Sequence, residues 1–248
     1  RGHRALCPYG GGARRVAPRE VGSSRPMADS VSDRLWRALS DHVVDAPAGD
    51  DLVNPYADAD PALDVDGAAA IRRENLRAST RTLSGPPEAL IVAEAPGPWG
   101  CRFSGVPLVS ESQLLDPDFP LDGRATSLRA MHGEPLKEYS GGIYWGTLLP
   151  HWDRFWTWNA VPFHPHKPGD PLTIRAPRVR ETRQFADALA AVVEAAQPGR
   201  VIALGRVAER ALTAVGVEST YVRHPSQGGA TLFRQGMAEV FGEGASGE

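Results

Sequence analysis

The chain has 248 residues, is 42% hydrophobic and carries a formal net charge of -3. This length suits one larger α/β domain or two small ones, with enough apolar residues for a sizeable core. Two cysteines without a CxxC motif exclude a disulfide framework, a four-cysteine zinc site and a four-cysteine iron–sulfur cluster. No apolar run is long enough to cross a membrane and no signal peptide is visible, so we expect a cytoplasmic protein.

Charge is distributed unevenly along the chain. Residues 41–66 are rich in aspartate and contain no Lys or Arg, whereas residues 164–183 contain five basic side chains against Asp170 and Glu181. The small net charge therefore conceals a candidate basic face.

The N-terminal part begins with a Gly- and Arg-rich stretch, residues 1–26, which has no periodicity and is expected to be a disordered extension. A basic arm that grips phosphate is the alternative interpretation. Helical spacing of apolar residues predicts a helix over 30–44, with Ser30 as N-cap, and a second over 67–83 with its arginines facing solvent. A loop rich in Pro, Asp and Gly joins them.

The central feature is the uncharged apolar run that leads into Glu94-Ala95-Pro96-Gly97. It predicts a buried strand that delivers a carboxylate, Glu94, to its C-terminal end, where ligands bind in open α/β sheets. Gly100 and Gly105 follow, and between them Phe103 offers a flat apolar face. The alternative is that Glu94 only caps the next turn or helix.

The rest of the chain alternates strands with helices. Residues 106–144 are poorly periodic, which predicts a short helix near 110–115 and otherwise a lid or insertion over 106–150. The later pattern predicts strands at 154–161, 201–205 and 219–223 and helices at 177–196, 207–215 and 231–240. With the strand before Glu94, these elements predict a single α/β domain over 27–248, a three-layer α/β/α fold with a four-stranded parallel sheet.

Three of the predicted strands end in polar loops, which carry Glu94, Asn159 and His224. The carboxyl ends of parallel strands meet at one rim, so these side chains should converge. The Asn159 amide can pair with a lactam edge, Phe103 can stack on a planar ring, and His224 can bind an oxygen that gains negative charge. Glu94 can position water or balance a cation. Together they suit a planar heterocycle that leaves as an anion.

Each of these residues also has a purely structural interpretation. Asn159 could satisfy backbone groups, Phe103 could be core packing, and His224 could be a hydrogen-bonded loop residue. His164 and His166 could also hold a metal together with His224, although no acidic residue lies beside them. We expect no metal and no cofactor.

Several motifs resemble those of the uracil-DNA glycosylase superfamily, in particular the group known as family 4. In the family's order along residues 89–240 they are Ala93-Glu-Ala-Pro-Gly97, Gly100-Cys-Arg-Phe-Ser-Gly105, Asn159-Ala-Val161, Ile174-Arg-Ala-Pro177, Val201-Ile-Ala-Leu-Gly205 and His224-Pro-Ser226. Each motif is weak alone, and the ordered set is specific.

The resemblance implies a DNA repair enzyme of the bacterial cytoplasm or nucleoid that hydrolyses the N-glycosidic bond of deoxyuridine and leaves an abasic site. By matched position Phe103 would stack on the flipped uracil, Asn159 would read its Watson–Crick edge, and His224 would donate to the oxygen that becomes anionic. Glu94 would position water, and Ala95 and Gly97 would line the pocket.

DNA would be the partner of such an enzyme, bound mostly through phosphates, and we expect a monomer. The candidate DNA contacts are Lys167, Arg175, Arg223, Ser226 and Gln227.

The chain departs from the family 4 pattern at several points. Ala93 replaces a glycine, the acidic run after Gly97 is missing, and the cluster-binding cysteines are absent. Gln227-Gly-Gly follows the last motif in place of a bulky apolar wedge. Three functional alternatives remain: a non-catalytic binder of uracil or damaged DNA, a glycosylase for another deaminated base, and a metal-dependent hydrolase.

Overall fold

The structure is a computed structural model that describes residues 29–242. The predicted extension over 1–26 lies outside these residues. The centre of the fold is a four-stranded parallel sheet in the order β3-β2-β5-β6. Its strands are β2 (Ala89–Ala93), β3 (Phe155–Asn159), β5 (Arg200–Leu204) and β6 (Thr220–Val222). The prediction of a three-layer α/β/α fold is confirmed.

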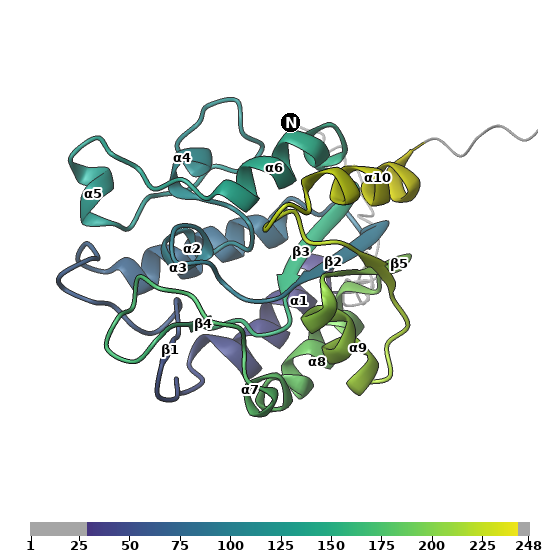
Figure 1. Ribbon diagram of the computed structural model, residues 1–248, viewed down its shortest axis with the longest axis horizontal. Helices are drawn as coiled ribbons and strands as arrows, with labels where there is room; N and C mark the ends of the chain where they lie inside the picture. The colour runs from purple at the N-terminus through teal and green to yellow at the C-terminus, as the bar shows by residue number, and fades with distance from the viewer. Residues whose placement is uncertain (1–28, 243–248) are drawn as a thin grey trace, which may run out of the picture.

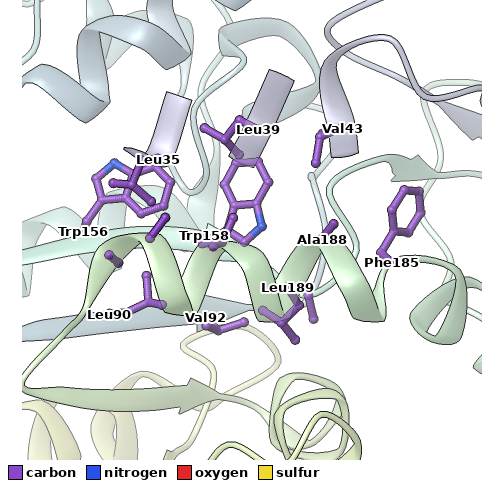
Figure 2. Close-up of a cluster of buried hydrophobic side chains, with 14 of the residues drawn as sticks. Leu35, Leu39, Val43, Leu90, Val92, Trp156, Trp158, Phe185, Ala188 and Leu189 are labelled. Atoms are coloured by element: carbon purple, nitrogen blue, oxygen red, sulfur yellow. The ribbon is translucent and has the colours of Figure 1, made fainter. Parts of the chain in front are cut away.

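One face of the sheet is covered by α1 (Val31–Leu39), α8 (Ala186–Ala196) and α9 (Arg206–Ala214). Alternate strand residues point to this side, so Leu90 and Val92 pack with Trp156 and Trp158 in one cluster. Figure 2 shows Leu35 and Leu39 meeting the two indoles, with Leu189 of α8 on the same cluster.

The opposite face is covered by α6 (Tyr139–Leu148) and α10 (Ala230–Phe241), which lie together above the sheet in Figure 1. Tyr144 of α6 is fully buried, stacks against Phe233 of α10 at 5.8 Å, and shares a hydrogen bond with Thr157. The sequence pattern did not predict α6, because its glycines and aromatic residues interrupt helical periodicity. The C-terminal end of the segment expected as a lid or insertion thus contains a helix of the outer layer.

The remaining elements lie around the layers. They are the π-helical turn Ser40–Val44, α2 (Ala68–Arg81), α3 (Cys101–Ser104), α4 (Glu111–Leu114), α5 (Leu128–Met131), the 3-10 turn Leu149–His151 and α7 (Val179–Gln184). A small antiparallel pair joins β1 (Leu52–Val53) to β4 (His164–Pro165). The helix predicted over 177–196 is divided at Phe185, which is buried against Phe163.

Several sequence predictions hold at the level of single residues. Ser30 caps α1, since its side chain accepts from the Asp33 N–H at 3.1 Å. The expectation that the arginines of the second helix face solvent is wrong for Arg72, which is fully buried. Its guanidinium lies 3.3 Å from the Asp64 carboxylate, so a buried charge is paired rather than solvated.

Candidate active site

The carboxyl ends of the strands form the rim that the sequence predicted. β2 and β3 run in register, with Ala93 opposite Asn159, and backbone hydrogen bonds from Ala160 and Val161 to the carbonyls of Ala93 and Glu94 extend this pairing past both strand ends. The Glu94 segment and Asn159 are thus neighbours. His224 follows β6, which β5 separates from β2.

Asn159 is buried, with 2% of its surface exposed. Its amide nitrogen contacts the Cys101 Sγ at 3.8 Å, and within residues 29–242 no hydrogen bond reaches its Oδ1. Burying an amide with so weak a hydrogen-bond partner costs free energy unless a ligand supplies a better one. The arrangement therefore does not support the interpretation that Asn159 serves backbone groups.

Phe103 lies on the short helix α3, which begins directly after Gly100. The ring is 2% exposed, and the Arg102 guanidinium lies 4.5 Å from its centroid. Gly105 ends the helix at φ 74°, where a Cβ would overlap the Arg72 backbone, so only glycine fits. Ala95 is half-buried and Gly97 is buried in the turn before this helix.

A buried charge cluster anchors α3 to the rest of the molecule. Arg102 donates to both carboxylate oxygens of Asp64, at 3.0 and 2.9 Å, and Arg72 donates to the Arg102 carbonyl at 3.0 Å. Burial lowers the pKa of Arg72 to about 10, despite the nearby Asp64 carboxylate. The sequence did not reveal this cluster, because its members are far apart along the chain.

The hydrogen bonds of His224 define its tautomer. Its Nδ1 accepts from the Ser226 N–H at 3.2 Å and lies 2.8 Å from the Ser226 hydroxyl. A neutral ring with an accepting Nδ1 carries its proton on Nε2. Burial, with a smaller contribution from Arg223, lowers the pKa of His224 to about 4. At neutral pH the Nε2–H is therefore a neutral donor.

Glu94 is half-buried at the end of β2. Burial raises the pKa of its carboxyl, and the Arg210 charge opposes this shift. No side-chain hydrogen bond of Glu94 exists within the described residues. The carboxyl is thus free to bind water or substrate.

A second carboxyl, from Glu138, lies at the same turn, and sequence reasoning missed it. Cβ atoms added at Gly97 and Gly100 would overlap Glu138 Oε1 and Oε2, so the carboxyl packs directly on these two glycines. Oε2 is buried and has no hydrogen-bond partner within residues 29–242. Burial raises the pKa of Glu138 to about 7. No local pattern predicts this contact, because Glu138 comes from the segment expected as a lid or insertion.

The five candidate DNA-binding residues differ in whether their side chains are free to contact a phosphate. Lys167 is exposed and Arg223 is half-buried, and neither forms an ion pair within the described residues. Gln227 is exposed at a loop tip with φ 51°, a strained angle for a residue with a Cβ. Ser226 directs its hydroxyl to His224.

Arg175 has a different position from the one expected. All five of its N–H groups are used, by the carbonyls of Asp51, His166 and Ala176 and by both oxygens of Glu181. It therefore ties the loop after β4 to α7 and has no N–H left for a phosphate.

The three histidines weighed as metal ligands do not converge. Both ring nitrogens of His164 lie against carbonyls, of Pro96 at 2.8 Å and Pro171 at 3.0 Å, and His166 Nδ1 lies 2.9 Å from the Lys167 carbonyl. Between residues 29 and 242 no group of three or more His, Cys, Asp or Glu side chains is arranged to hold a metal ion. Burial lowers the pKa of His164 to about 4.

A cavity of about 450 Å³ lies between α4, α6 and α10. Glu138 lines it together with Gln113, Lys137, Tyr139 and Arg234, whereas Phe103, Asn159 and His224 do not. Glu138 therefore faces this cavity on one side and the Gly97–Gly100 turn on the other.

The fold matches a solved structure, wild-type SMUG2 of Pedobacter heparinus, a member of the uracil-DNA glycosylase superfamily. The alignment has a TM-score of 0.55 and 11% sequence identity, and it covers 86% of this chain and 97% of that one. At this identity the likeness establishes the fold, which is that of the uracil-DNA glycosylases. No protein-family model and no curated protein matches the chain, so the resemblance to family 4 stays a prediction.

In the described part of the chain, every helix is too short or too polar to cross a bilayer.

Proposed function

We propose that the protein is a DNA glycosylase that hydrolyses the N-glycosidic bond of deoxyuridine, releases free uracil and leaves an abasic site. The observation that carries this proposal is a pair of side-chain donors at one sheet rim. The Asn159 amide has only a thiol contact at 3.8 Å, and the Nε2–H of His224 has no hydrogen-bond partner within the described residues. The likeness of the fold to SMUG2 supports the same class of reaction.

The chemistry requires stabilisation of a leaving anion. The C1′–N1 bond breaks with its electron pair on the base, while a water oxygen bonds to C1′ and gives up a proton. The neutral Nε2–H of His224 can donate to the uracil oxygen that becomes anionic, and the Asn159 amide can pair with the base edge. Such preorganised donors act mainly in the transition state.

Glu94 would serve the other half of the reaction. A carboxylate near C1′ can orient the attacking water and balance the positive charge that develops on the sugar. Ala95 and Gly97 line the turn beside it, and Phe103 supplies the stacking surface at the start of α3.

The base must leave the duplex to reach this rim, at a cost of a few kcal/mol that is smaller for a mispaired uracil. Arg223, Ser226 and Lys167 are proposed phosphate contacts. Gln227, exposed at the loop tip after His224, is the proposed wedge that enters the gap.

A cleavage assay tests the proposal. The protein is incubated in EDTA with single-stranded and G·U duplex oligonucleotides that carry one labelled uracil, and the products are treated with alkali. We expect strand breaks at uracil and free uracil by mass spectrometry, with both reduced strongly in Asn159→Ala and His224→Ala. Binding without breaks would point to a non-catalytic binder. Breaks at hypoxanthine or xanthine instead of uracil would identify another base specificity.

A further inference from the structure

The Glu138 carboxyl occupies the place where a ligand would approach the glycine turn. Gly97 and Gly100 follow the strand that ends at Glu94, and their missing side chains leave room above the turn. The structure fills this room with a carboxyl from another segment, since Glu138 Oε1 and Oε2 would overlap a Cβ at either position. The two glycines and the Glu138 carboxyl therefore form one continuous surface at this turn.

This carboxyl also lies near the residue proposed to read the base. α3 begins after Gly100 with Cys101, whose thiol contacts the Asn159 amide at 3.8 Å. The pKa of the Cys101 thiol is raised by its burial and, to a smaller extent, by the charge of Glu138. Glu138, Cys101 and Asn159 thus form a continuous group beside the turn.

The buried Oε2 lacks a partner within the described residues, a cost that a fold tolerates when a ligand supplies the missing hydrogen bond. Glu138 also lines the cavity of about 450 Å³ between α4, α6 and α10, which is large enough for a nucleobase. The Glu138 side chain thus touches both the glycine turn and this cavity, and Oε2 is its buried atom without a partner.

We propose that Glu138 is a specificity-determining residue of the base pocket and donates a hydrogen bond through Oε2 to a carbonyl oxygen of the base. This inference rests on the proposed function. A carboxylate at this position would repel a base that leaves as an anion, whereas a neutral acid stabilises it. The neutral acid is therefore the active form, and cleavage should weaken as Glu138 ionises.

The surroundings of Glu138 decide its protonation. Burial favours the neutral acid, and the Ser140 hydroxyl opposes this by binding the charged form. Cys101 of α3 faces it, Gln113 of α4 is neutral, and the cations Lys137 and Arg234 line the cavity beside it. Lys137 is exposed to solvent, which weakens its effect on the buried carboxyl.

The test is the single-turnover rate of uracil cleavage between pH 5.5 and 9. We expect the wild-type rate to fall about tenfold per pH unit above a midpoint near 7, as for one ionising group. Glu138→Gln, which keeps a donor at every pH, should follow the wild type below pH 6 and stay flat above it. Glu138→Ala should be about 10²-fold slower than the wild type below pH 6, as expected for one lost donor to an anion, and its rate should not show the fall near pH 7.

The matched control is Glu134→Gln, which changes an exposed acid of the same segment and should keep the wild-type profile. Circular dichroism and thermal unfolding check the fold of each variant. If Glu138→Gln does not fold, the side-chain 13C signal of Glu138 in the wild type still tests the inference. It should titrate near pH 7 and shift when an abasic-site oligonucleotide and free uracil bind together.

The possible results distinguish a wrong role for Glu138 from a wrong proposed function. A rate that rises through pH 7 and collapses in Glu138→Gln would make Glu138 a general base and overturn the proposed donor role. A Glu138→Gln profile identical to the wild type would make Glu138 a bystander, with the glycosylase assignment intact. A wild type that cleaves no deaminated base at any pH would overturn the proposed function, and this inference with it.

Discussion

At the scale of single residues, the site depends on the state of His224. Its Nδ1 accepts from a backbone N–H, so a proton added there would break that bond as well as place a charge in a partly buried site. The ring is held neutral by its surroundings, which suits a donor to a leaving anion better than a cation that has to be desolvated.

The first prediction is that His224 titrates far below the usual range for histidine. Its folded pKa is about 4 against a reference of 6.5, so the unfolded chain binds more protons between these values. Stability linked to His224 is therefore present above pH 6.5 and is lost as the pH falls toward 4. Histidine NMR signals should show two midpoints near 4, from His164 and His224, and one of them should disappear in His224→Ala. A His224 midpoint above 6 would contradict the inference that burial keeps the ring neutral.

The second prediction concerns the two proposed donors. Asn159→Ala and His224→Ala should each reduce the single-turnover cleavage rate by about 10²–10³, because each removes a donor that acts in the transition state. Their thermal midpoints should stay close to the wild type, since Asn159 has only a weak thiol contact and His224 bonds only to the nearby Ser226 in the same loop. The exposed Asp153→Asn serves as the unaffected control. Full activity in either alanine variant would remove that residue from the site.

At the scale of elements, the position of α3 is fixed by a buried ion pair, because the helix itself is very short. The helix has four residues, so its position depends on the bidentate contact of Arg102 with Asp64. Phe103 is fixed by this contact, because Arg102 lies beside its ring in the same turn. A loop of the N-terminal half thus positions the proposed stacking residue.

The third prediction follows from this anchor. Asp64→Asn leaves two buried guanidinium groups without a counter-charge, and breaking a buried pair in this way costs about 3–5 kcal/mol. Urea unfolding should show this loss. Any folded fraction should also cleave more slowly because Phe103 is displaced. Arg73→Gln, which removes an exposed pair to Asp45, should change stability by less than about 1 kcal/mol.

At the scale of elements, some parts of the fold could be predicted from the sequence and others could not. The strands were predictable, because short uncharged runs such as Leu90–Ala93 end in turn residues. The helix α6 and the β1–β4 pair were not, because they depend on residues far away in the chain: Tyr144 of α6 packs on Phe233, and β1 pairs with β4 more than 100 residues later. For the same reason the sequence placed Arg175 at a phosphate and gave no sign of Glu138: a side chain's partners across the fold cannot be read from its neighbours in the chain.

At the scale of the whole molecule, net charge argues against strong general attraction to DNA. The formal net charge is -3, so the proposed DNA binding would rely on a few cations near the rim. Arg175 is already used by Glu181 and backbone carbonyls, which leaves Arg223 and Lys167 as the main candidates.

The fourth prediction is a shallow salt dependence of DNA affinity. Arg223→Ala should weaken binding of a 12-mer single strand and lower the slope of log K against log salt by about 1, because one phosphate contact is lost. Fluorescence anisotropy between 50 and 200 mM salt measures both quantities. Arg37→Ala, on α1 and paired with Asp29, should leave the slope unchanged. Equal effects of the two substitutions would argue against a rim contact.

Two indoles give this molecule an optical signal beside the candidate active site. Trp156 and Trp158 stack at 5.7 Å with planes 6° apart, and Trp158 directly precedes Asn159. Indoles held this close couple their electronic transitions, so the native protein should show an exciton couplet in circular dichroism that depends on the geometry of β3. An inactive Asn159 variant that keeps the couplet has an intact β3, so its loss of activity comes from the missing amide. A variant that loses the couplet has a disturbed β3.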